Sequence, residues 1–545
     1  MSQRFHPGLA YKAFDKIVAR VELWADSAIH YVAGENLREV KERLVQRFVD
    51  LCYTAYASEA GARSESGVNP FPDNKPHLDY NSVRVKQTTG ILSISIKQFI
   101  VSLGSFWLHW LYTLACIIPS RTVFGTSADT PAAIVFGVGL NSLFQDGRDE
   151  RFQTFCRKGP VTPLTVADKI YVHAVPMKRM PNIDHIRYSE HTTTTDHIRY
   201  TRFPLHALFR DGQLGLSARM SFLLSHLTMV AKFMLSVAIR PTLILLGRDF
   251  ADACMVRQLD HCGLIESVII TNSNANSQPL WMRDHATRRF TLHMVLYSQN
   301  DLPFAYKQDG VIADFPNYRH VRSDEYWVWT EGFAQYLERL GLRGKKHVIG
   351  PVLWYLPEQQ RAPSPSTDLT IVVFDVTPIK NSLSVPLGLV NDYYSPATMS
   401  AFIEDIVATV ADLKHSTGLN IRLLLKTKRR YIPRHDEAYI AMLHRLDKAG
   451  AIEIIHFQDN MYSLLSEAQA SIVAPFSSPA LVAAHVGTPA IYYDPTDLIM
   501  PNYEALPGIS FATSQAALNE RLTGILIDKP LSSASLSPTG EISLP

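Results

Sequence analysis

The chain has 545 residues, more than one hydrophobic core usually organises, so we expect two or three domains. Hydrophobic residues make up 46% and charged residues 19%, which is typical of a globular protein and excludes a disordered chain. The 53 Lys and Arg residues against 51 Asp and Glu leave a net charge of +2, so no global field attracts nucleic acid. Any cationic site must therefore be local.

The cysteines and the N-terminal residues indicate the compartment. The five cysteines are scattered, odd in number and without the spacing of zinc ligands, which indicates reduced thiols. The first 20 residues lack the apolar segment of a secretory signal. We therefore expect a cytoplasmic protein.

Residues 1–88 are predicted to form a helical N-terminal extension followed by a loop. Up to residue 60, apolar side chains recur three and four positions apart with charges between them. Residues 61–88 are rich in turn-forming residues and poor in apolar ones, which is typical of a domain boundary.

Two apolar segments follow, at residues 99–119 and 217–239. The first has the length of a membrane span and no charge, but serines, a histidine and Pro119 interrupt it. The second is weakly basic, and its Lys232 suits a lipid surface. We favour core helices for both, while a helix in a membrane interface remains open for both and a true span for the first. If the helices lie in a membrane interface, the partner is the inner membrane, which the protein would contact peripherally.

Residues 89–355 are predicted to form an N-terminal Rossmann-like lobe on the acceptor side, which includes these apolar helices. Short apolar runs alternate with helix-like stretches in this region, as in a mostly parallel α/β sheet. The pentapeptide DHIRY occurs twice, at 184–188 and 196–200, which we interpret as a duplication within a loop. The predicted strands are 132–139, 169–175, 242–249, 266–272, 292–298 and 347–352.

A second Rossmann-like lobe is predicted at residues 369–528. Residues 356–368 contain three prolines and no hydrophobic cluster, so they are predicted to be a linker. Residues 529–545 are predicted to be a flexible tail. Five strands and four crossover helices predict a nucleotide-sugar-binding sheet. The strands are 369–375, 421–426, 452–457, 471–476 and 489–494.

Cationic and hydroxyl side chains follow two of these strands, where ligands of such sheets bind. The basic residues are suited to phosphate oxygens, although a charge run alone is more often a solvated loop. Ser477 and Ser478 precede Pro479 and an Ala-rich helix, whose N-terminus is an anion site with Ser478 as the expected N-cap. We expect both groups to hold one phosphate. The basic residues are Lys426, Lys428, Arg429 and Arg430.

Three further polar residues stand at strand exits: Asp375, Thr377 and Asp494. They would either order the phosphate loops and touch ribose and sugar hydroxyls, or simply form turns, as Asp before Pro commonly does.

The residues of this second lobe resemble a known family. The segments VFDVTPIK, LLLKTKRR and VAPFSSPALVAAHVGTPAIYYDP are similar to bacterial polysaccharide biosynthesis proteins named for a Pro-Phe-Thr-Ser motif, which is PFSS at 475–478 here. The resemblance covers about the last third of the chain, with a fainter echo at 272–284. The chain also looks like GT-B glycosyltransferases of surface-carbohydrate assembly.

The resemblance implies two Rossmann-like lobes facing a cleft, and an enzyme that transfers a sugar from a CMP- or UDP-linked donor. The acceptor would be a growing surface polysaccharide, such as capsule or lipopolysaccharide, or a lipid-linked glycan. In CMP-sugar enzymes of this kind a paired Ser/Thr motif binds the phosphate, and that role falls on Ser477 and Ser478. The chain departs from their pattern where KTKRR replaces a His-Pro pair and where the helix after the serines lacks a ribose-binding glutamate.

Catalysis is expected to need neither a metal nor a cofactor. The sequence has no convincing DxD motif, and Lys/Arg charge with helix dipoles can stabilise the departing nucleotide. An inverting mechanism needs a general base from the first lobe, for which Asp249 at the end of the 242–249 strand is the first candidate. Asp284 and His285 come next. A nucleotide-sugar epimerase of the same fold and a non-catalytic polysaccharide-assembly protein remain as alternatives.

Overall fold

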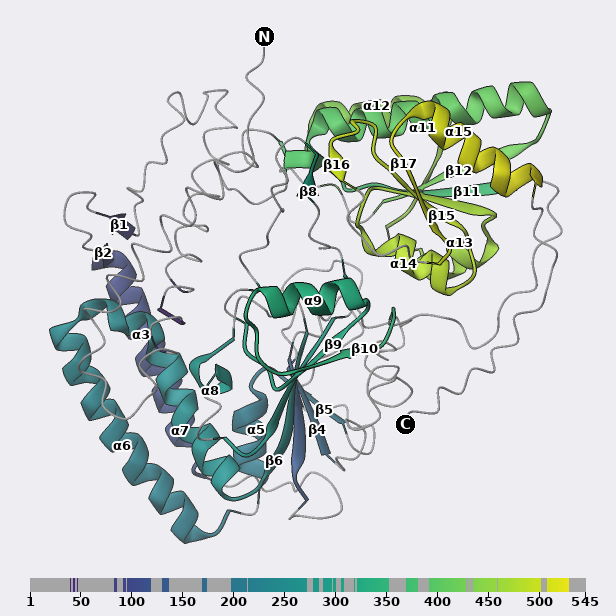
Figure 1. Cartoon of the computed structure of the whole chain (residues 1–545). Coiled ribbons are helices and arrows are strands. Elements are labelled where there is room, and N and C mark those ends of the chain that lie inside the picture. The colour runs from purple at the N-terminus through teal and green to yellow at the C-terminus, as the bar shows by residue number, and fades with distance from the viewer. Residues whose placement is uncertain are drawn as a thin grey trace. The chain divides into compact units, whose positions relative to one another are not determined.

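In a computed structural model, the chain divides into two compact units, which we describe separately (Figure 1). Unit 1 comprises residues 1–299, 313–355 and 382–392, and unit 2 comprises the rest. The structure describes residues 40, 43, 44, 47, 83–85, 92–94, 96–118, 130–136, 169–173, 198–212, 214–271, 278–283, 288–296, 298–299, 305–307, 318, 321–351, 369–380, 392–427, 431, 435–457, 459–500 and 507–528.

Unit 1 is built on a seven-stranded sheet in the order β10-β9-β7-β6-β3-β4-β5. All neighbouring strands are parallel, so the chain starts at β3, winds out to β5, and returns to the other side through β6. The strands are β3 (Ala132–Val135), β4 (Lys169–His173), β5 (Ile198–Thr201), β6 (Ile265–Thr271), β7 (Thr291–Val295), β9 (Glu325–Val328) and β10 (Lys345–Val348).

The helices of unit 1 include a group in which both α3 (Ile96–Ala115) and α6 (Leu216–Ile239) pack on α7 (Gly247–His261) (Figure 1). Phe106 and Phe233 pack in their shared core, with ring centroids 5.1 Å apart. The remaining elements are α5 (Pro204–Asp211), the 3-10 helix η4 (Pro241–Leu246), α8 (Leu280–Arg283), α9 (Glu331–Arg339) and the antiparallel pair β1 (Val83–Val85) and β2 (Leu92–Ile94).

Two predictions for unit 1 are wrong, and strands β5 and β9 were missed. Residues 242–249 form η4 and the start of α7 rather than a strand, because a short apolar run is equally typical of a buried helix. The second DHIRY copy leads into strand β5 rather than lying in a loop. Strand β9 was not predicted at all. The first DHIRY copy lies outside the described residues.

Unit 2 contains a six-stranded parallel sheet in the order β13-β12-β11-β14-β15-β17. Numbered along the chain this is 3-2-1-4-5-6, the order of the dinucleotide-binding fold. The strands are β11 (Leu369–Phe374), β12 (Ile421–Lys426), β13 (Glu453–Ile455), β14 (Ala470–Val473), β15 (Ala490–Tyr493) and β17 (Ile509–Ala512). The first five were predicted, and the sixth was missed.

Helices cover both faces of this sheet: α11, α12 and α15 lie on one face, and α13 and α14 on the other (Figure 1). Local caps explain their ends, since Ser395 accepts from Thr398 N at the start of α11 and Gly418 ends that helix with a φ of 71°. The elements are η7 (Asp392–Tyr394), α11 (Pro396–Thr417), α12 (Glu437–Lys448), α13 (Met461–Glu467), α14 (Ser478–His485), α15 (Gln515–Thr523), the π-helix η8 (Gly524–Asp528) and the pair β8 (Ala305–Tyr306) and β16 (Ile499–Met500).

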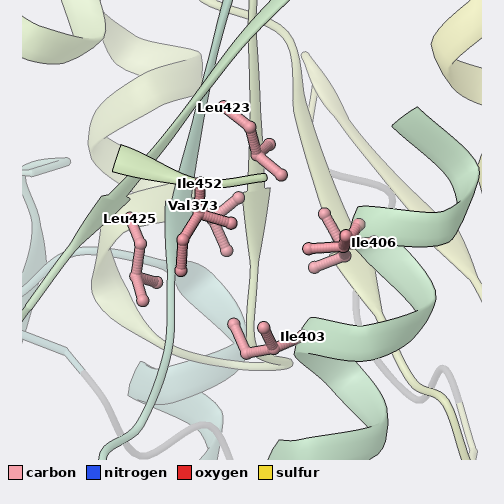
Figure 2. Close-up of a pocket in the computed structure, with 7 residues that line it drawn as sticks. Val373, Ile403, Ile406, Leu423, Leu425 and Ile452 are labelled. Atoms are coloured by element: carbon pink, nitrogen blue, oxygen red, sulfur yellow. The ribbon is translucent and has the colours of Figure 1, made fainter. Parts of the chain in front are cut away.

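A small space between α11 and the sheet is lined only by aliphatic side chains (Figure 2). Ile403 and Ile406 of α11 face Val373 of β11 and Leu423 and Leu425 of β12, and the space has no room for a water molecule. It belongs to the hydrophobic core and offers nothing to a polar ligand.

The predicted fold class is confirmed for the two units, each an α/β unit with a parallel sheet. Of the predicted N-terminal extension, the structure describes residues 40, 43, 44 and 47, all helical, and strand β1. The predicted linker 356–368 and tail 529–545 lie outside the described residues.

Candidate functional site

The candidate site of unit 2 lies where its sheet changes winding direction. Strands β11 and β14 are neighbours, and the chain leaves them toward opposite sides of the sheet. Ligands of such sheets bind beyond the carboxyl ends of the strands at this switch point. The residues that follow β11 begin at Asp375, and those that follow β14 lead through Phe476 to the N-terminus of α14.

The turn between β14 and α14 has an unusual backbone. Phe476 has a φ of 60°, a left-handed conformation that a bulky residue rarely adopts and that costs about 1–3 kcal/mol. Tyr394 Oη donates to Pro475 O at 2.6 Å, and Tyr492 Oη donates to Ser477 O at 3.1 Å. Buried tyrosines from two other elements therefore hold the carbonyls on either side of Phe476. No local sequence pattern indicates the strain of this turn.

The two serines have different roles from those predicted. Ser477, rather than Ser478, is the N-cap residue of α14, and Ser478 is the first helical residue. Ser477 Oγ donates to Ala474 O at 2.8 Å, so its proton is used within the turn. Only 4% of Ser477 and 9% of Ser478 is exposed, so neither hydroxyl faces open solvent. The groups of this turn that are suited to an anion are therefore the backbone N–H groups of the first turn of α14.

Asp375, at the exit of β11, is tied to α12. Tyr439 Oη donates to Asp375 Oδ2 at 2.7 Å, and Thr377 Oγ1 lies 3.5 Å from the same oxygen. Burial, with the nearby Asp375 carboxylate, raises the pKa of Tyr439 well above its ordinary value, so the phenol remains a donor. Asp375 thus orders the β11 exit, and Thr377 is the half-buried hydroxyl beside it.

Lys426 is turned inward at the exit of β12. Its Nζ donates to Phe457 O at 2.7 Å and to Thr427 O at 3.2 Å, and 6% of the residue is exposed. Burial lowers the pKa of Lys426 to about 8, although Asp459 opposes this shift. Lys426 therefore connects the exit of β12 to the exit of β13. Lys428, Arg429 and Arg430 lie outside the described residues, so their convergence with the serines stays a prediction.

Beyond the basic segment, the chain returns to the β11 exit. Ile379 and His435 form an isolated antiparallel bridge, and Asp436 N donates to Pro378 O at 3.0 Å. The segment that contains the cations is thus connected at its far end to the loop after β11.

Asp494 is a turn residue. It is fully buried, and its carboxylate accepts from Tyr393 Oη at 2.9 Å, Thr496 Oγ1 at 2.7 Å and Ile499 N at 3.0 Å. Of its two predicted roles, turn formation is the one that these contacts support, because both oxygens are engaged within the protein.

The first catalytic candidate of unit 1 does not stand at a strand end. Asp249 lies in the first turn of α7 and is 8% exposed. Its Oδ2 accepts from Arg43 Nε at 2.7 Å and from Leu280 N at 3.1 Å. These contacts join three segments of unit 1, which is a structural role. Asp284 and His285 lie outside the described residues.

Comparisons with known proteins agree with this architecture. The profile described as "Polysaccharide biosynthesis PFTS motif protein" matches residues 228–522, which is more than half of the chain. No curated protein matches.

Three solved structures illustrate the likeness of fold. The apo form of the lipopolysaccharide outer core galactosyltransferase WaaB is 11% identical, with 73% of this chain and 91% of that chain covered and a TM-score of 0.36. The wall teichoic acid polymerase TagF is 11% identical, with 79% of this chain and 89% of that chain covered and a TM-score of 0.38. The UDP-GlcNAc 2-epimerase of Methanocaldococcus jannaschii, in complex with UDP-GlcNAc and UDP, is 12% identical. The match covers 73% of this chain and 93% of that chain, with a TM-score of 0.36.

These TM-scores are low, so the structural likenesses carry no weight for function. The family profile does, because it spans strands β6, β7, β9 and β10 of unit 1 and all six strands of the sheet of unit 2, including the PFSS turn at 475–478. The chain therefore belongs to the polysaccharide biosynthesis PFTS motif family.

Proposed function

We propose that the protein is a metal-independent glycosyltransferase, which moves a sugar from a nucleotide-activated donor to a growing surface polysaccharide or a lipid-linked glycan. The observation that carries this proposal is the placement of the PFSS turn at the switch point of a 3-2-1-4-5-6 sheet, directly before α14. A turn of this kind presents helix N–H groups to an anion. Membership of the polysaccharide biosynthesis family supports a sugar-linked nucleotide as that anion.

The donor phosphate would lie between the first turn of α14 and the basic segment after β12. Backbone N–H groups supply directed donors, and Lys428, Arg429 and Arg430 supply positive charge for the departing nucleotide. Thr377 stands at the neighbouring strand exit and would contact ribose or sugar hydroxyls. A CMP- or UDP-linked donor suits this arrangement.

Replacement of Lys428 by Ala is expected to weaken nucleotide binding about tenfold, because it removes one charge-assisted contact to phosphate. Calorimetry with CMP, UDP and GDP measures the affinity, and Ser478→Ala should weaken it less. Lys448→Ala is the control, because Lys448 is an exposed cation at the end of α12. Unchanged affinity in both site variants would contradict the proposed site, and no binding of any nucleotide by the wild type would favour a non-catalytic assembly protein.

An epimerase is the second candidate, because non-hydrolysing nucleotide-sugar epimerases share this architecture. The purified protein is incubated with a nucleotide sugar and no acceptor. Conversion of the sugar would favour the epimerase. A donor that is stable alone and is consumed only when a glycan acceptor is added would support transfer.

Peripheral contact with the cytoplasmic face of the inner membrane is the second part of the proposal. Fourteen of the eighteen large hydrophobic side chains that are exposed among the described residues lie on α3 and α6 or at Ile118. Neither helix contains Asp or Glu, and Lys97 and Lys232 are exposed on them. By length and composition, α6 alone of the described helices could cross a membrane, with 33% of its apolar window buried. An apolar, weakly basic surface suits an anionic bilayer.

The double variant Leu108→Glu, Leu224→Glu is expected to reduce flotation with anionic phospholipid vesicles at least about fivefold, because each change places a charge in the bilayer interface. These side chains are 73% and 63% exposed, so the fold should tolerate the change. Ile527→Glu, at an exposed apolar residue of unit 2, is the control. Equal flotation of both variants, or no flotation of the wild type, would contradict membrane contact.

A further inference from the structure

Three acid–base side chains from three helices of unit 1 meet in its interior. His109 of α3, His206 of α5 and Asp252 of α7 each offer one ligand atom, and these atoms all lie within 4.8 Å of one another. His109 is 7% exposed, His206 is 2% exposed and the Asp252 side chain is 20% exposed. Two of the three side chains are thus buried and the third is mostly so, and no part of the proposed transfer uses the cluster.

Hydrogen bonds orient the two imidazoles. His109 Nε2 lies 2.7 Å from Asp252 Oδ1, and His206 Nε2 lies 3.0 Å from Thr113 Oγ1. Thr113 Oγ1 donates its only proton to His109 O at 2.9 Å, so it accepts from His206. His206 is therefore the Nε2–H tautomer, and its Nδ1 carries the lone pair that a metal ion needs.

The charges of the cluster suit a cation. Two buried imidazoles beside one carboxylate bring nitrogen and oxygen lone pairs close together, within reach of one ion. Burial alone would raise the pKa of Asp252, but the hydrogen bond and charge of His109, with His206 and Arg248, keep it below its ordinary value. A divalent cation held between the three side chains would supply a countercharge to this carboxylate.

A third histidine lies beside the cluster. His226 of α6 is fully buried, and neither of its ring nitrogens is satisfied within the part of the chain that the structure describes. Its ring stacks near Phe222 and Trp110, with centroids 5.1 and 6.0 Å away, and the charges of His109 and Asp252 both act on it. A buried polar ring without a partner is costly, and an ion or a water held nearby is the usual explanation.

We propose that His109, His206 and Asp252 bind one divalent ion of the zinc class, which fastens α3, α5 and α7 together. Two imidazole nitrogens and one carboxylate oxygen are a common zinc ligand set, with the fourth position open to a water or another ligand. Thr113 would be the outer hydrogen-bond partner that orients His206. With metal–ligand bonds of about 2.0–2.2 Å, tetrahedral ligand atoms lie roughly 3.4 Å apart. His109 Nε2 and Asp252 Oδ1, now 2.7 Å apart, would therefore separate to admit the ion, and ligand atoms up to 4.8 Å apart would approach by roughly 1 Å.

This site is separate from sugar transfer and does not alter the expectation that the transfer itself needs no metal. Its ligands come from positions 97 and 46 residues apart in the sequence, at His109, His206 and Asp252, so no short motif reveals them. The proposal therefore depends only on unit 1, and it stands whether or not the protein proves to be a transferase.

The test is metal binding by the full-length protein after treatment with a chelator. Titration with Zn²⁺ should show one tight equivalent per chain, and Co²⁺ in its place should give the intense visible absorption of a four- or five-coordinate site. Zn²⁺ should also raise Tm by about 5 °C, because an ion that binds only the folded state stabilises it. His206→Ala and Asp252→Asn should each weaken Zn²⁺ binding at least about tenfold, because each change removes or neutralises one of the three protein ligands.

His261→Ala is the matched control, because His261 is an exposed histidine at the end of α7 and its loss should leave the affinity unchanged. If the ligand variants do not fold, Thr113→Val keeps the shape of a buried residue and should weaken Zn²⁺ binding by a few fold. Absence of a tight equivalent in the wild type overturns the proposal. So does binding that His261→Ala abolishes, or that Thr113→Val and the ligand variants leave unchanged, since the ion would then sit on surface histidines.

Discussion

Asp249→Asn is expected to lower the free energy of unfolding of unit 1 by about 3–5 kcal/mol, the usual loss when one partner of a buried ion pair is removed. The two side chains of this pair are 5% and 10% exposed, so water screens their interaction poorly. The same carboxylate oxygen accepts from Leu280 N, which connects α7 to α8. An amide keeps the shape but not the charge, so Arg43 would lose its ion pair with residue 249 in a nearly dry environment.

Denaturant unfolding, followed by a signal from unit 1, measures this loss. Glu331→Gln is the control, because Glu331 is an exposed acid of α9 in the same unit and should change stability by less than about 0.5 kcal/mol. Nucleotide binding by unit 2 should persist wherever the variant is folded. A variant with wild-type stability and no transferase activity would instead restore Asp249 as the catalytic base.

Much of unit 2 could be predicted because local and long-range preferences agree there. The last four residues of both β11 and β12 are buried, and most of them are aliphatic, as in strands of a covered parallel sheet. α11 begins at a Ser-Pro cap and ends at a left-handed glycine, which are local signals for both of its ends. The sixth strand, β17, is half-buried and short, and its pattern is too weak to stand out.

Unit 1 was harder because its apolar runs do not distinguish strand from helix. Residues 242–246 are as buried as any strand of the sheet, yet they form a 3-10 helix that continues into α7. Pro241 begins this segment without breaking it, since a proline is tolerated in the first turn of a helix. The error moved Asp249 to a strand end and made it look like a catalytic residue.

The sequence predicts at which strand ends the candidate site residues stand, but it does not predict the direction of their side chains. Which end of the sheet binds a ligand follows from its parallel order, and that order follows from the alternation of strands and helices. The direction of each side chain depends on partners distant in sequence. Tyr439 holds Asp375 across 64 residues, and Tyr393 holds Asp494 across 101. No spacing rule reveals such pairs, so Asp375 and Asp494 could equally have been ligands or turn residues.

Phe476→Ala and Phe476→Gly are both expected to destabilise unit 2 by about 3–5 kcal/mol, because the ring is 1% exposed and packs near Tyr492 and Phe511. Their order is the sharper expectation. Alanine keeps the strain of a left-handed residue, whereas glycine adopts a φ of 60° freely. The glycine variant should therefore be the more stable of the two by about 1 kcal/mol.

The matched control is Phe402, a fully buried phenylalanine in the middle of α11. Within a helix alanine is favoured over glycine by about 1 kcal/mol, so Phe402→Ala should be more stable than Phe402→Gly, the reverse of the order at residue 476. Denaturant unfolding of the four variants gives both orders in one experiment. If the alanine variant were more stable than the glycine variant at both positions, the backbone of Phe476 would not be strained.

Nucleotide binding separates the role of this turn from its stability. Calorimetry under conditions in which every variant is folded should show weaker binding for both Phe476 variants, because the ring and the tyrosines around it fix the turn that leads into α14. The Phe402 variants, with a similar loss of stability, should bind as the wild type does. Equal affinity in all four would show that the α14 N-terminus does not hold the nucleotide, and the phosphate would then have to be bound elsewhere in the chain.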